Sequence, residues 1–146
     1  MPLLKVVEIS QGLRSRLEQI KPSNGYHTEL QRVYGPTEKP TDKAPLPLAL
    51  IRPQHDTKTS AAGVQATRVR TYEIEVQFSK SADEAALSAV HVDILRALGF
   101  GQDQPERKFP GLLEEDDQAE FRFASAGETT HSITLTIGVL YVESYN

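Results

Sequence analysis

Cysteine is absent from this chain of 146 residues. Its absence excludes disulfides, cysteine-ligated zinc, iron–sulfur clusters and thiol nucleophiles together, and it is compatible with a reducing cytosol. Long apolar runs are absent too, since no stretch approaches the roughly 20 residues that span a bilayer. The N-terminal segment reaches the charged Glu8 too early for a secretory signal. We therefore expect no membrane partner and no secretory leader.

Positive charge is also limited. Lysine and arginine number 16 against 20 aspartates and glutamates, which leaves a formal net charge of −4. A protein that binds nucleic acid normally presents a basic face or stripe. The composition therefore favours proteins as partners. Its ordinary hydrophobic content predicts one domain over residues 1–146.

Catalytic and cofactor motifs are not recognisable in the sequence. The histidines fall in four separate segments, without the i, i+4 spacing of a helical metal site. Gly99 and Gly101 follow a predicted helix rather than a strand, which is the wrong context for a dinucleotide-binding loop. We therefore expect no metal, no cofactor and no enzymatic activity. The histidines are His27, His55, His91 and His131.

One catalytic alternative uses three carboxylates. Glu73 and Glu75 lie two apart on a predicted strand and share a face, and with Asp93 they would form a nuclease-like site for a divalent cation. A solvated strand face is the simpler interpretation, because the neighbourhood offers little positive charge for phosphate. The acidic run at residues 114–117 lacks the spacing and central glycine of a calcium-binding loop.

Two amphipathic helices are predicted. Apolar residues recur at steps of three and four from Leu3, and this helix is expected to end near Ile20 because a proline follows at position 22. The second is expected over residues 82–98, with a capping box formed by Ser81 and Glu84 and a left-handed cap at Gly99.

Strand patterns lie between and after these helices. The clearest is residues 72–78, where apolar and polar residues alternate. Residues 54–63 are polar and small, which predicts a mobile loop or hairpin tip, and residues 102–118 are predicted to be an exposed connection. The element order predicts an α+β fold with an antiparallel or mixed sheet and two main helices packed on one face. The other predicted strands are residues 26–34, 46–52, 119–125 and 132–143.

In this order the elements resemble the tail terminator, or tail completion, proteins of long-tailed phages. The phrase Ile20-Lys21-Pro22-Ser23-Asn24-Gly25-Tyr26-His27-Thr28 after the first helix carries part of the likeness. The stretch from Asp93 to Leu98 in the second helix carries another part, as does the terminal strand from Ile133 to Tyr141. None of these phrases is a catalytic signature.

The resemblance implies a subunit of a hexameric ring in the virion, at the head-proximal end of the tail tube. Such a ring ends tube polymerisation and joins the tube protein to a head-completion or stopper protein, while DNA passes through the lumen without specific binding. Assembly would take place in the host cytoplasm. Another neck or tail component, a stopper or a tube protein, is the alternative that shares the lack of catalytic motifs.

Charges in the two long connections suggest where subunits would meet. Cations lie in or beside residues 54–63, and the acids lie in residues 102–118, so the two groups are expected to pair between neighbouring subunits. The predicted interface residues are Lys58, Arg68, Arg70, Glu114, Glu115, Asp116 and Asp117.

Overall fold

The computed structural model describes residues 4–145, apart from the side chain of Asp116. Its elements in chain order are α1 (Lys5–Glu18), η1 (Pro22–Asn24), β1 (Arg32–Tyr34), β2 (Leu48–Ala62), β3 (Gln65–Ser79), α2 (Glu84–Leu98), η2 (Pro105–Arg107), β4 (Leu112–Arg122) and β5 (Thr130–Ser144). The described strands form one five-stranded sheet in the order β1-β2-β3-β5-β4. Only the β1–β2 pair is parallel. The predicted α+β fold with a mixed sheet is thus confirmed.

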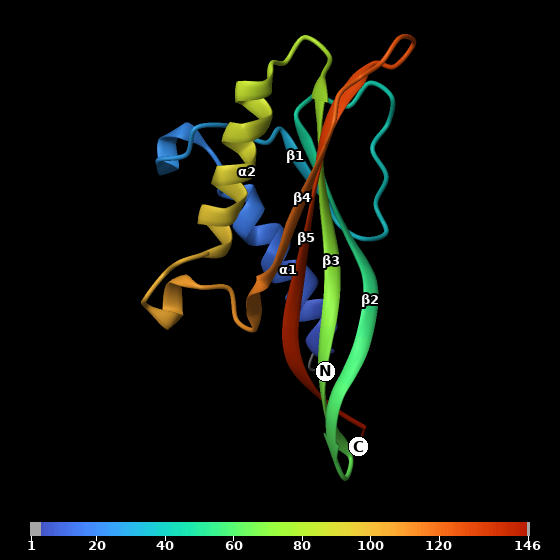
Figure 1. Cartoon of the computed structure of the whole chain (residues 1–146). Coiled ribbons are helices and arrows are strands. Elements are labelled where there is room, and N and C mark those ends of the chain that lie inside the picture. Colours follow the sequence, from blue (N-terminus) through green and yellow to red (C-terminus); the bar gives the residue numbers. More distant parts are fainter. Residues whose placement is uncertain (1–3, 146) are drawn as a thin grey trace.

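Both helices cover the same face of the sheet, called here the helix face (Figure 1). Along β3, Tyr72, Ile74 and Val76 point to this face and are fully buried. They pack with apolar residues of β5 and with the apolar stripes of both helices in one main core. The alternation that predicts a strand at residues 72–78 therefore reflects a sheet with one buried face.

The caps of α2 fix its position in the sequence. Its N-cap is Asp83, whose carboxylate accepts a hydrogen bond from the Ala86 amide at 3.0 Å, so the predicted capping box at Ser81 is wrong. The Ser81 hydroxyl instead contacts Ser79. Gly99 has φ 85° and closes the helix in the left-handed conformation, as predicted. The first helix, α1, ends at Glu18, two residues before the predicted end.

The opposite face of the sheet, called here the outer face, is covered at one end only. The segment of residues 36–47 passes over it (Figure 1) and packs Ala44 and Leu46 against Tyr34, Leu48 and Leu50. The rest of this face is open to solvent. Among the described helices none is long and apolar enough to cross a membrane.

The predicted loop at residues 54–63 is a strand for most of its length. Here β2 continues to Ala62 and pairs with β3, leaving a tight turn around Gly63. Its side chains are mostly exposed on both faces because the hairpin extends beyond the helices (Figure 1). The sequence therefore lacks the alternation of apolar and polar residues that would have predicted a strand. The expected hairpin tip exists, but its strands are much longer than predicted.

The predicted connection at residues 102–118 also contains a strand. From Leu112 the chain pairs with β5, beginning with Leu112 opposite Val139. The acidic residues hid this strand because they bulge out of the register between Leu113 and Gln118. Strand boundaries differ elsewhere too: of residues 26–34 only Arg32–Tyr34 form a strand, and β2 begins at Leu48 rather than 46.

Candidate functional site

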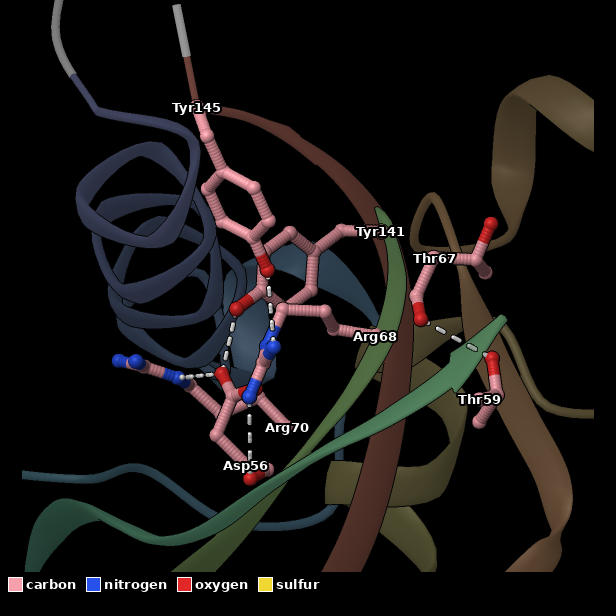
Figure 2. Close-up of polar contacts among 7 residues, drawn as sticks. All are labelled: Asp56, Thr59, Thr67, Arg68, Arg70, Tyr141 and Tyr145. Atoms are coloured by element: carbon pink, nitrogen blue, oxygen red, sulfur yellow. Dashed lines mark hydrogen bonds and ion pairs between the residues drawn. The ribbon is translucent and has the colours of Figure 1, made fainter. Parts of the chain in front are cut away.

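A carboxylate on β2 binds two arginines of β3 near the end of the sheet (Figure 2). Asp56 accepts hydrogen bonds from Arg68 Nε at 2.5 Å and from Arg70 Nε at 2.9 Å. The hydroxyl of Tyr141 on β5 donates to the same carboxylate. Arg68 also donates to the Tyr145 hydroxyl at 3.0 Å. These residues meet because β2, β3 and β5 are neighbours in the sheet, and they are called here the Asp56 cluster.

The cluster shifts the ionisation of its members. Partial burial works to raise the pKa of Asp56, but hydrogen bonds from Tyr141, Arg68 and Arg70 outweigh it and the pKa is lowered. Burial and the neighbouring Asp56 raise the pKa of Tyr141 to about 12. One carboxylate faces two guanidinium groups, so the cluster keeps a surplus of one positive charge at neutral pH.

The two arginines differ in how fully they are used. In Arg68, the Nε and one terminal nitrogen bind the Asp56 carboxylate and Tyr145, and the other terminal nitrogen lies 3.5 Å from the Asp56 carbonyl. Arg70 contacts Asp56 through Nε, and its terminal nitrogens point away from the other residues drawn (Figure 2). Lys58 lies opposite Arg68 in the register and is exposed. The surplus positive charge of the cluster is therefore available to a partner mainly through the terminal nitrogens of Arg70.

The acidic residues form a bulge on β4, at the other edge of the sheet. Residues 114–117, called here the acidic bulge, lie opposite the single residue Ile137 of β5. Glu114 folds back: it accepts a hydrogen bond from the Gly101 amide and lies 3.2 Å from Lys108 Nζ. The Gly101 amide and Lys108 lower the pKa of Glu114. Glu115 and Asp117 are exposed, and the side chain of Asp116 lies outside the described part of the structure.

The predicted cations and acids are therefore not partners within one chain. The cations lie on β2 and β3, while the acids lie on β4, separated from them by β5. Within the described chain, Arg68 and Arg70 are held by Asp56, which the sequence analysis did not single out. Asp56 stands in a polar stretch without periodicity. Arg68 and Arg70 follow 12 and 14 residues later on the next strand, and Tyr141 lies 85 residues away.

Two cavities flank α1 on the helix face. One, of about 480 Å³, lies toward Phe109 and Tyr141. The other, of about 510 Å³, lies between α1, the turn at residues 35–38 and the edge strand β2. This second cavity is called here the Arg70 pocket. Its lining residues are Val6, Val7, Ser10, Gln11, Arg14, Gly35, Pro36, Thr37, Glu38, Pro53 and Arg70.

The other charges of the Arg70 pocket neutralise each other. Arg14 donates to Glu38 at 2.8 Å, and the same Glu38 oxygen accepts the Gly35 amide. The Gly35 amide lowers the pKa of Glu38, helped by Arg14. Glu38 is therefore occupied by local partners. The remaining charge of the lining is Arg70, which shares Asp56 with Arg68 and so brings the surplus positive charge of the Asp56 cluster to the pocket.

The three carboxylates of the nuclease alternative do not converge. Glu73 and Glu75 alternate with buried Ile74 and so face outward on β3, where Glu75 binds Arg52 at 2.7 Å. Asp93 lies in α2 on the other side of the sheet and is fully buried. The proposed three-carboxylate site is therefore wrong. Within residues 4–145 no group of three or more metal-ligating side chains was found that could hold an ion.

Asp93 instead binds the segment after the first helix. Its carboxylate accepts the amides of His27 at 3.1 Å and Thr28 at 2.7 Å, and the Thr28 hydroxyl at 2.6 Å. Arg96, one turn later, donates to the Gly25 carbonyl at 3.1 Å and lies over the Tyr26 ring at 4.9 Å. The segment after the first helix and the C-terminal half of α2 thus form one packed unit. Sequence reasoning missed this contact because the partners lie 65 and 66 residues apart.

Comparison with known proteins adds no assignment: no protein-family model matches the chain, and no curated protein matches it. The fold and its two oppositely charged edges therefore define the molecule only as an α+β domain with two candidate contact surfaces.

Proposed function

We propose that this protein is a structural, non-enzymatic ring subunit of the phage tail terminator type. In this role it stands at the head-proximal end of the tail tube in the virion, ends tube growth and offers a surface to a head-completion or stopper protein. Copies associate head to tail, and DNA passes through the lumen of a ring of six without being read.

The observation that carries the proposal is the unlike charge of the two sheet edges. The β2 side holds the Asp56 cluster with its surplus positive charge. The β4 side holds the acidic bulge, where Glu115 and Asp117 add negative charge that Lys108 does not offset. Two different, complementary patches on one subunit are what a head-to-tail contact requires, and such contacts generate closed rings when the rotation between copies completes a circle.

The packed unit around Asp93 gives a second line of support. The phrase at residues 20–28 and the phrase from Asp93 onward are two of the parts of the sequence that resemble tail terminators, and they bind each other directly. A resemblance carried by residues that support one another in the fold is stronger than one carried by unrelated turns.

The same surfaces also suit a tube protein, and assembly distinguishes the two roles. A tube protein stacks its rings into filaments, whereas a terminator stops at a single ring. We expect electron microscopy of the purified, concentrated protein to show rings without tubes. Long filaments would favour the tube protein instead.

The decisive test uses the phage that encodes the chain. Removing its gene is expected to give overlong tails, because nothing ends tube growth. These tails should also lack heads, because the surface that joins them to the head is missing. Supplying the protein in trans should restore tail length. Tails of normal length in the deletion would refute the proposal.

A further inference from the structure

The Arg70 pocket and the acidic bulge lie at the same level on opposite edges of the sheet. Pro53, which lines the pocket, pairs with Tyr72 of β3. Tyr72 pairs in turn with Ile137 of β5, and the acidic bulge lies opposite Ile137. One row of the sheet therefore runs from the pocket to the bulge.

This alignment matters for the symmetry of an assembly. Two unlike patches that meet between copies give a closed ring when the copies are related by rotation alone, and an open helix when each step also adds a translation. Patches at the same level along the strands allow rotation without translation about an axis parallel to the strands. The geometry thus favours closure.

Both edges resist pairing through their backbones at this level. On β2, Pro53 lacks an amide hydrogen, and the register shifts between Pro53 and His55 and again between Lys58 and Ser60. On β4 the acidic bulge interrupts the ladder. Prolines, bulges and edge charges are the features that prevent strands from adding to a sheet edge. A contact at this row therefore has to use side chains.

From these observations we infer that the Arg70 pocket binds the carboxylates of Glu115 and Asp117 from the neighbouring copy of this chain. The inference rests on the proposed function and names its contact. The terminal nitrogens of Arg70 are directed away from Asp56 and supply the fork that a carboxylate accepts. Gln11 and Ser10 supply further polar groups in the lining.

Charge matching supports this occupant over a neutral segment. In the pocket, Arg14 and Glu38 form a pair, and Arg70 shares the single carboxylate of Asp56 with Arg68, which leaves a surplus of one positive charge. In the acidic bulge, Glu114 pairs with Lys108, which leaves the exposed Glu115 and Asp117. The two patches thus carry residual charges of opposite sign, which attract each other.

A new acid at the pocket tests the contact. Val7 lines the pocket and is 38% exposed, while Val92 on α2 is 47% exposed and does not line it. Val7→Glu is expected to raise the protein concentration for half-assembly of rings by more than about tenfold, because like charges across an interface repel. Val92→Glu, which makes the same chemical change, should leave assembly unchanged. Mass photometry and sedimentation measure both.

A charge exchange then separates repulsion from misfolding. Glu115→Lys with Asp117→Lys should also weaken rings, and adding Val7→Glu to this pair should recover part of the loss, because the new carboxylate gives the lysines a partner. Wild-type protein that forms no ring at any concentration contradicts the proposed function. Wild-type rings that tolerate Val7→Glu contradict the pocket contact alone, as does a combined variant that assembles no better than the double-lysine variant.

Engineered thiols give a direct readout, since the natural chain has no cysteine. Oxidation of Gln11→Cys combined with Asp117→Cys should yield a ladder of covalent oligomers that reductant abolishes. Gln11→Cys combined with Ala126→Cys, whose second thiol lies in the turn between β4 and β5, should stay monomeric. A ladder from the control pair, or none from the test pair in assembled rings, overturns the inference. Duplex DNA that competes with ring formation at the pocket would overturn it too, by identifying a phosphate site.

Discussion

Two aspartates, Asp93 and Asp56, each bind several groups from other parts of the fold. Asp93 is fully buried and receives two backbone amides and a hydroxyl, so it holds the segment at residues 27–28 against α2. Asp56 is partly exposed and joins three strands through Tyr141, Arg68 and Arg70. The first has a structural role in the core, whereas the second fixes the direction of a cation at the surface.

Asp93→Asn should destabilise the fold without changing the shape of the side chain. The amide presents a donor where Thr28 also donates, which leaves buried donors unsatisfied. We expect the free energy of unfolding to fall by about 2–3 kcal/mol in denaturant titration. Asp83→Asn is the matched control, because asparagine caps a helix about as well as aspartate. An equal loss in both variants would contradict the role of Asp93.

Asp56→Asn is expected to lower the free energy of unfolding by about 1–3 kcal/mol at neutral pH, because charge-assisted hydrogen bonds are lost. The lowered pKa of Asp56 gives a stabilisation that is present above its ordinary value of 3.8 and is lost as the pH falls through the folded value. The difference between wild type and variant should therefore shrink below pH 3.8. The exposed Asp103→Asn serves as control. A difference that persists in acid would point to packing instead.

At the scale of the element, the edge strands determine what the sheet can join. The long hairpin of β2 and β3 extends beyond the helices and keeps its outer edge irregular. Strand β4 is shaped near its start: Gly111 approaches β5 closely just before the strand begins, and the acidic bulge follows inside the strand, at residues 114–117. The Leu140 amide donates a hydrogen bond to the Gly111 carbonyl at 2.7 Å, which fixes this approach.

Gly111→Ala should disturb this junction. Gly111 has φ 81°, and a Cβ there would lie 2.1 Å from the Leu140 carbonyl oxygen. Gly127 has φ 88° with no atom near its Cβ position, so Gly127→Ala isolates the backbone term of about 1–2 kcal/mol. We expect Gly111→Ala to cost about 1–3 kcal/mol more, since overpacking is added. Thermal unfolding of both variants measures the difference, and equal shifts would contradict the close approach.

The sequence predicts those elements whose burial alternates. Strand β3 is evident from Tyr72, Ile74 and Val76 because one face is buried, and α2 from its apolar stripe and Gly99. The outer half of β2 has no such signal, because its side chains are exposed on both faces and its order comes from pairing with β3. Strand β4 was hidden for a different reason, because its acidic residues bulge out of the register between Leu113 and Gln118.

The candidate site was predictable only as a set of charges. Arg70 and the acidic bulge were found from composition, but that Asp56 holds Arg70 follows from the pairing of β2 with β3. The position of the pocket and the bulge in one row across the sheet depends on the register of four strands. No local pattern contains that register, so the complementarity emerges only from the folded sheet.

At the scale of the whole molecule, the two edges of the sheet carry patches of opposite charge. The formal net charge is −4, and the surplus cation at Arg70 would be consumed in a ring contact. Salt would weaken the contact, because partly exposed ion pairs are screened.

A passive lumen must not retain the DNA that passes through it. We expect the protein to bind duplex DNA more weakly than about 10⁻⁴ M at physiological salt, the weak end of non-specific binding. Fluorescence anisotropy with a labelled duplex measures this. Glu115→Lys with Asp117→Lys is the informative comparison: two substitutions that each add two positive charges change the net charge from −4 to 0, so DNA binding should strengthen. Micromolar binding by the wild type, with a steep dependence on salt, would contradict a passive lumen, because a retained genome could not pass freely through the ring.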